Sequence, residues 1–231
     1  MKNKIIGAML LSTVLLSSFA VTPALAVGTA TSKGDITFTE PTGPVDPVKP
    51  TDPTKPVEPA DPANPGTGQS GPLSLDVVPT LPFGTHEIGN GTQTYTVDGS
   101  KNATPYLQVS DRRGVGTDGQ AQGWNVTVKV SDFKKGDQIL EGAELNFGAS
   151  EIKTVPENTS AKPASAEIEN LSMASGATSI FSATKDQGLG TWLSVYDPAN
   201  ISLTVPEAAV GTFTADLTWD LTAGPVGTPT P

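Results

Sequence analysis

Cysteine is absent from this chain of 231 residues, and histidine occurs only once. Without cysteine the chain has no thiol nucleophile, no disulfide and no Cys-based zinc site, so core burial alone must hold a folded domain together. The single histidine, His86, follows Phe83-Gly84 at a turn, a position typical of a surface residue. No nucleophile elbow, Walker loop or HExxH motif occurs. We therefore expect no catalytic residue, no cofactor and no metal site.

Carboxylates are the remaining enzymatic option, since hydrolysis of wall glycan needs an acid and a base. Glu141 with Glu144, or Glu167 with Glu169, are candidate pairs, but 24 acidic residues also produce pairs by chance. Four aspartates lack the spacing of an EF-hand calcium loop: Asp111, Asp118, Asp132 and Asp137. A wall-active hydrolase remains an unfavoured alternative.

Basic residues are scarce, with 14 Lys and Arg against 24 Asp and Glu and a formal net charge of -10. Nucleic acids and anionic membranes are bound by clustered Lys and Arg, so the composition argues against both as partners. It also argues against attachment by charge to anionic wall polymers. Any wall contact is expected to involve sugar or peptide.

Long apolar runs are missing beyond the first residues, so we expect no membrane insertion of the exported chain. Lys2 and Lys4 precede an uncharged, mostly apolar stretch from Ile5 to Ala20, and Ala24-Leu25-Ala26 forms an A-x-A cleavage site. This pattern predicts a secretory signal peptide over residues 1–26. The last residues, 226–231, form a tail without a sorting pentapeptide, which favours non-covalent retention at a surface.

A proline repeat separates the start of the chain from the rest. Residues 27–40 form a leader with one strand candidate at 36–39. Nine prolines then recur at every third position from Pro41 to Pro65, which matches the three-residue turn of polyproline II. With the glycine-rich joint at 66–71, residues 41–72 are predicted to form a spacer of roughly 75 Å.

Short alternating apolar and polar runs fill residues 73–225, and glycine and proline interrupt them too often for long helices. The clearest runs are 73–77, 124–131 and 213–222, where period two predicts strands with one buried face. Further strand candidates lie at 93–98, 105–110, 138–147, 166–173, 178–184, 190–196 and 200–205. The fold class predicted from this pattern is all-β, an antiparallel β-sandwich.

Two ordered segments then carry a resemblance. The first joins the turn Asp111-Arg112-Arg113-Gly114 to Gly123 and the first motif, Trp124-Asn125-Val126; the second ends in the second motif, Trp219-Asp220-Leu221. The chain resembles the WxL-domain family of surface proteins from low-GC Gram-positive bacteria over nearly its whole exported length. It departs from the family at Val126, where a leucine is usual.

The resemblance implies non-covalent attachment to peptidoglycan, in complexes with other WxL proteins and membrane-anchored proteins, some of which adhere to host matrix proteins. The expected location is the bacterial cell surface. A structural protein docked on a membrane-anchored partner, without glycan contact, is the main alternative.

The two motifs allow two interpretations. Residues i and i+2 share a face of a strand, so Trp124 and Val126 lie on one face of their strand, as do Trp219 and Leu221 of theirs. These faces are predicted to be core, and the tryptophans would then stabilise the sandwich by about 2–3 kcal/mol each. The alternative is that one or both rings line a groove and stack on sugar or peptide. The orientation of Trp192 stays open, because its segment is apolar on both parities.

Overall fold

The structure is a computed structural model, and it describes residues 28–224. The predicted signal peptide and the tail lie outside this range. Residues 28–38 form a unit of their own and contain no strand, so the strand expected at 36–39 is wrong. Ile36 and Phe38 are 78% and 84% exposed. The alternating run of four residues is short, and it has no partner strand with which to form a ladder of hydrogen bonds.

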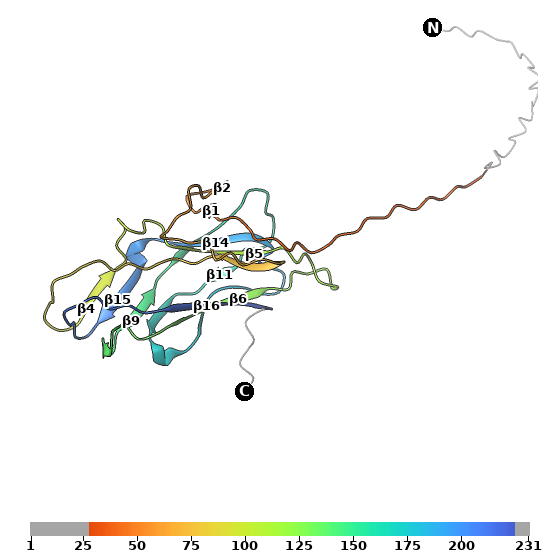
Figure 1. The fold of residues 1–231 in the computed structure, drawn as a ribbon. Coiled ribbons are helices and arrows are strands. Elements are labelled where there is room, and N and C mark those ends of the chain that lie inside the picture. The colour runs from red at the N-terminus through yellow and green to blue at the C-terminus, as the bar shows by residue number, and fades with distance from the viewer. Residues whose placement is uncertain (1–27, 225–231) are drawn as a thin grey trace, which may run out of the picture. The chain divides into compact units, whose positions relative to one another are not determined.

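Residues 39–224 are all-β, as predicted, and every strand pairing among them is antiparallel (Figure 1). One four-stranded sheet has the order β10 (Ser150–Thr154), β14 (Gly190–Tyr196), β5 (Tyr106–Asp111) and β3 (Leu73–Val77). A second has the order β11 (Ala164–Ser165), β13 (Thr178–Ala183), β6 (Trp124–Val130) and β16 (Leu217–Ala223). A third has the order β12 (Ile168–Leu171), β9 (Glu144–Phe147), β15 (Ile201–Val205) and β4 (Gln93–Thr96).

Two small hairpins and two short helices complete the described residues. The hairpins are β1 (Val48–Lys49) with β2 (Asp52–Pro56), and β7 (Lys134–Lys135) with β8 (Gln138–Ile139). The 3-10 helices are η1 (Met173–Ser175) and η2 (Pro198–Asn200). The predicted strand at 213–222 begins only at Leu217, because Thr214 forms a separate bridge with Lys134.

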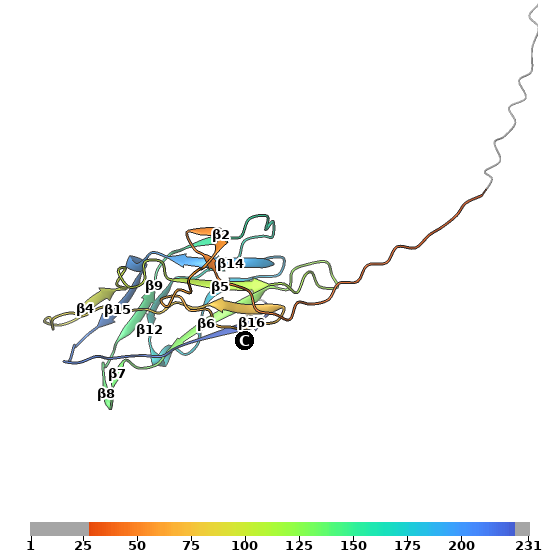
Figure 2. The same cartoon turned by 45° about the horizontal axis from the view of Figure 1, so that its top comes forward.

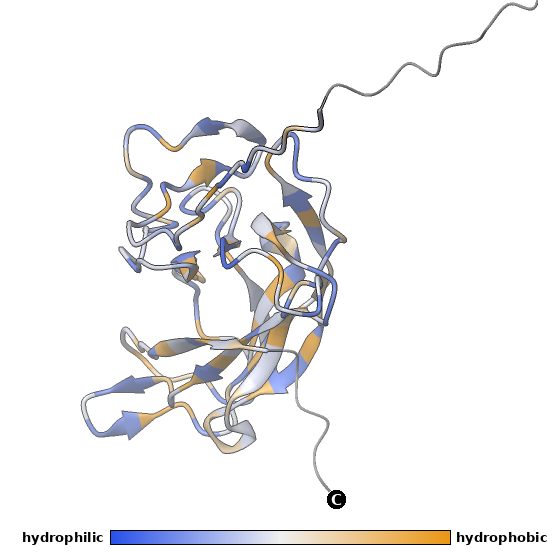
Figure 3. Cartoon of the chain, turned by 90° about the vertical axis from the view of Figure 1, so that its right-hand side faces the viewer, coloured by the Kyte–Doolittle hydropathy of each residue, from blue (hydrophilic) through white to orange (hydrophobic). Residues whose placement is uncertain are grey.

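The main core contains buried residues from all three four-stranded sheets. Part of it lies between the sheet of β5 and β14 and the sheet of β6 and β16, which form separate layers in Figures 1 and 2. Alternate residues of β5 and β6 point into it, among them Leu107, Val109, Trp124, Val126 and Val128, all fully buried. Figure 3 shows the same alternation as orange and blue bands along the strands. The period-two pattern therefore predicted the buried faces correctly.

The proline-rich segment differs from the expected extended spacer, because residues 43–66 pack on the outer face of β5 and β14. Val48 joins a second apolar cluster with Val77, Tyr106, Leu193 and Val195. The backbone N–H of Val48 donates to Oε1 of Gln108 at 2.8 Å. The threefold proline repeat describes a local backbone preference, whereas this packing joins residues 60 positions apart.

A buried polar network completes this contact. Asn64 is only 4% exposed and its Nδ2 donates to Oδ1 of Asn102 at 3.1 Å. Beneath the segment, the Asp76 carboxylate accepts hydrogen bonds from Ser110 Oγ and Gln108 Nε2. Burial raises the pKa of Asp76, and these hydrogen bonds oppose the rise. The proline-rich segment is thus part of the folded unit.

Candidate functional site

The two motifs lie on neighbouring strands of one sheet. In the antiparallel pairing of β6 and β16, Leu221 is opposite Val126 and Trp219 is opposite Val128. Segments almost a hundred residues apart are therefore adjacent. The sheet order makes β6 a central strand and β16 an edge strand, so the two motifs meet different surroundings.

The first motif is inside the protein. Trp124 and Val126 have no exposed surface, and Asn125 is 9% exposed and accepts a hydrogen bond from Ser179 Oγ. The Trp124 ring packs edge-on against Phe181, with centroids 4.8 Å apart, and its Nε1 donates to the carbonyl of Gly188 at 3.0 Å. Trp124 and Val126 thus present no surface to a ligand and Asn125 very little, and their contacts hold β6 in the core.

The second motif is partly exposed. Trp219 and Leu221 are half-buried against the core, while Asp220 between them is exposed. The Trp219 ring meets Phe147 edge-on at a centroid distance of 6.0 Å. Most of the exposed surface of the six motif residues therefore belongs to Trp219, Asp220 and Leu221.

The turn before the first motif closes a loop. Asp111, with a fully buried side chain, pairs with Arg113 at 2.7 Å, and Arg113 Nη2 donates to the carbonyl of Gly123 at 2.7 Å. Gly123 has φ of 72°, and a Cβ there would lie 2.5 Å from the carbonyl oxygen of Ala183. Only glycine fits this position, which explains the Gly-Trp pair as a structural unit.

Trp192 points into the core, which the sequence left open. It is 4% exposed, and its Nε1 donates to the carbonyl of Leu189 at 2.8 Å. Trp124 bonds the preceding carbonyl, that of Gly188. The two indoles thus anchor one loop, residues 186–190, through two consecutive carbonyls.

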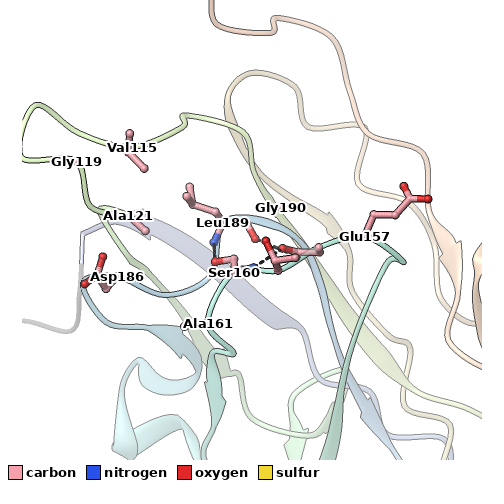
Figure 4. Close-up of a pocket in the computed structure, with 11 residues that line it drawn as sticks. Val115, Gly119, Ala121, Glu157, Ser160, Ala161, Asp186, Leu189 and Gly190 are labelled. Carbon is pink, nitrogen blue, oxygen red and sulfur yellow. Dashed lines mark hydrogen bonds between the residues drawn. The ribbon is translucent and has the colours of Figure 1, made fainter. Parts of the chain in front are cut away.

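That loop borders a pocket of about 390 Å³ together with residues 115–121 and 157–161 (Figure 4). We call this the three-loop pocket. Ser160 and Leu189 lie near its centre, with Asp186 and Glu157 toward opposite ends. Sequence reasoning missed it, because no single segment carries a recognisable binding pattern and the three loops meet only in the folded chain.

His86 lies on the surface, as expected from its turn. Its Nε2 is 2.6 Å from the carbonyl of Phe83, and its ring stacks on Tyr95 with centroids 4.3 Å apart. Within residues 28–224, no group of three or more His, Asp or Glu side chains is arranged to hold a metal ion. Nor does any helix among these residues have the length and apolarity to cross a membrane.

Comparison with known protein families gives one match over most of the chain. The family described as "WxL domain surface cell wall-binding" matches residues 26–225. The chain belongs to the WxL family. Neither the curated proteins nor the solved structures contain a match.

Membership gives the WxL domain a cell-wall-associated location at the bacterial surface and a wall-binding function. It also gives meaning to the valine in the first motif. Val126 occupies a fully buried position on β6 opposite Leu221, so the departure from leucine changes core volume and no exposed surface.

Proposed function

We propose that this WxL domain attaches the exported chain to the wall by direct, non-covalent contact with peptidoglycan. One observation carries the proposal: the wall-binding family match, residues 26–225, encloses every strand of residues 28–224. The contact therefore falls on the surface of this sandwich. Other surface proteins, including WxL proteins, membrane-anchored proteins and host matrix proteins, are proposed as additional partners, and the domain is proposed to act without enzymatic activity.

Within the motifs, the proposed wall contact is restricted to Trp219, Asp220 and Leu221, because the first motif is enclosed. Asp220 supplies a hydrogen-bond acceptor, and the exposed part of Trp219 supplies aromatic surface beside it. Trp124, Asn125 and Val126 contribute by supporting the sheet on which β16 lies.

One feature favours the alternative of docking on a protein partner. β16 pairs with β6 along one edge, and within residues 28–224 no named strand pairs with its other edge. An open edge offers backbone N–H and C=O groups to an added strand. A membrane-anchored partner bound there would hold the chain at the surface without any glycan contact.

Co-sedimentation with purified, protein-free sacculi tests the proposal. The chain after the predicted cleavage, residues 27–231, is mixed with sacculi after its fold has been checked by circular dichroism. We expect it to pellet and to be released when the glycan is digested. Folded protein that stays in the supernatant would contradict direct wall binding and favour the docking alternative. Zymography on wall substrate tests for hydrolysis, and a cleared band would overturn the non-enzymatic assignment.

A further inference from the structure

The lining of the three-loop pocket restricts what it can bind. Its eleven lining residues include no aromatic and no basic side chain. A sugar ring would find no aromatic face for stacking, and an anionic polymer would find no counter-charge. The middle is small and apolar, with Ala121 and Leu189, and Val115 is 58% exposed beside them.

The walls of the pocket are linked to one another. Asp186 N–H donates to the Ala121 carbonyl at 3.0 Å, and Gly188 N–H donates to the Ala161 carbonyl at 2.9 Å. These bonds join the loop 186–190 to each of the other two loops. Together with the hydrogen bonds from the indoles of Trp124 and Trp192, these bonds hold the loop in place before any ligand arrives. Such pre-organisation lowers the ordering cost of binding.

The side chain of Asn158 extends this frame into the pocket. Its Nδ2 donates to the carbonyl of Leu189 at 3.0 Å, and its Oδ1 accepts from the N–H of Ser160 at 3.0 Å. Ser160 Oγ in turn accepts from the N–H of Leu189 at 3.1 Å. The polar groups at the centre of the pocket therefore hydrogen-bond to one another and hold it in one shape. Selection between ligands is left to the two ends of the pocket.

Each end carries an exposed carboxylate on strained backbone. Glu157 and Asp186 have φ of 68° and 72°, and they are two of three non-glycine residues with positive φ in residues 28–224. Backbone strain of this kind concentrates at functional sites. Asp186 accepts from Gln120 Nε2 at 2.8 Å, and within the described residues neither carboxylate has a cationic partner inside 4.0 Å.

We propose that the three-loop pocket binds a short peptide carrying a free ammonium group. The peptide can lie in either direction, so its ammonium pairs with the carboxylate at one end or the other, and the apolar middle accommodates small side chains such as methyl groups. The inference rests on the proposed function, because the wall supplies this chemistry in stem peptides whose side-chain amines are not cross-linked. It assigns wall recognition by this pocket to peptide rather than to glycan.

The test compares sacculi before and after acetylation of their free amines. We expect residues 27–231 to bind acetylated sacculi at least about tenfold more weakly, as the loss of charge-assisted hydrogen bonds implies. Glu157→Gln with Asp186→Asn should weaken binding to untreated sacculi by a similar factor. Both replacements keep the shape of the side chain, and asparagine tolerates positive φ. The matched control, Glu141→Gln with Glu207→Gln, removes the same charge from two exposed sites away from the pocket and should bind normally.

A soluble probe locates the site. A synthetic stem peptide with its side-chain amine free should shift amide resonances of the three loops, and the same peptide acetylated at that amine should not. If wild-type protein binds both kinds of sacculi equally, or the peptide shifts no resonance of these loops, the pocket assignment is overturned while wall binding stands. If wild-type protein pellets with neither kind of sacculi, the proposed function itself fails, and the pocket assignment fails with it.

Discussion

The strands β6 and β16 carry the same Trp-x-aliphatic spacing, pair with each other, and still differ in what their side chains experience. On β6 both motif side chains, Trp124 and Val126, are fully enclosed. On β16 the corresponding Trp219 and Leu221 are half-buried. Spacing decides which face a side chain takes, whereas the strand's place in the sheet decides how much covers it.

The two tryptophan rings also differ in the parts of the protein that they contact. Trp124 donates to the Gly188 carbonyl and so supports a loop of the three-loop pocket, while Trp219 packs against Phe147 of β9. One family motif is thus a structural support and the other lies where a ligand or partner has access. Substitutions that separate stability from binding therefore test the comparison directly.

The largest expected effect comes from truncating each tryptophan. Trp124→Ala should lower the free energy of unfolding by about 3–5 kcal/mol, because it leaves a large cavity and an unpaired carbonyl. Trp219→Ala should cost only roughly 1–2 kcal/mol, since part of the ring is already in water. Urea unfolding measures both. Equal losses would contradict the distinction between a central and an edge motif.

The next largest effect on stability is expected at Gly188, which contacts the Trp124 indole. Gly188 has φ of 79°, and a Cβ there would lie 2.6 Å from Nε1 of Trp124, so Gly188→Ala should cost roughly 2–4 kcal/mol from strain and overpacking. Gly119→Ala is the matched control, with φ of 77° and no atom within 4 Å of the added Cβ. It should cost only the backbone strain, about 1–2 kcal/mol. Thermal or urea unfolding of the two variants separates the cost of overpacking from the cost of backbone strain. Equal losses of stability would mean that the space beside Trp124 tolerates the added methyl group.

Exchanging valine and leucine in the two motifs tests how tightly each aliphatic side chain is packed. Val126→Leu restores the residue usual in the family, but it adds a methylene to a fully buried site and should destabilise by about 1–3 kcal/mol. Leu221→Val, at the half-buried position opposite, should cost about 1 kcal/mol or less. A stabilised Val126→Leu variant would show that the first motif is underpacked.

The smallest effect on stability is expected at Asp220, whose side chain is exposed. Asp220→Asn should change the free energy of unfolding by less than about 0.5 kcal/mol. If Asp220 accepts a hydrogen bond from the wall, binding to sacculi should fall about fivefold, because asparagine keeps an acceptor oxygen but loses the negative charge that strengthens the bond. Asp216→Asn, an exposed aspartate just before β16, serves as the control and should bind like the wild type. Unchanged binding of Asp220→Asn would remove the second motif from the wall contact.

Much of the fold follows from local pattern. Alternation in 73–77, 93–98, 105–110 and 124–131 predicted strands that the structure contains as β3, β4, β5 and β6. β10 went unpredicted, because Ser150–Thr154 has only one strongly apolar residue and depends on its pairing with β14. The three-loop pocket was equally inaccessible, because positive φ at Glu157 and Asp186 has no signature in a single sequence.

The sequence by itself determined the all-β class, the buried face of each alternating strand and the two motifs that identify the family, because these depend on neighbours two residues apart. Tertiary structure alone decided the rest. β14 is apolar on both parities because Trp192 and Tyr196 face the main core while Leu193 and Val195 face the cluster around Val48. The proline repeat could not reveal that residues 43–66 cover this face of the sheet. Its local backbone preference is overruled by hydrogen bonds to distant side chains, those of Gln108 and Asn102.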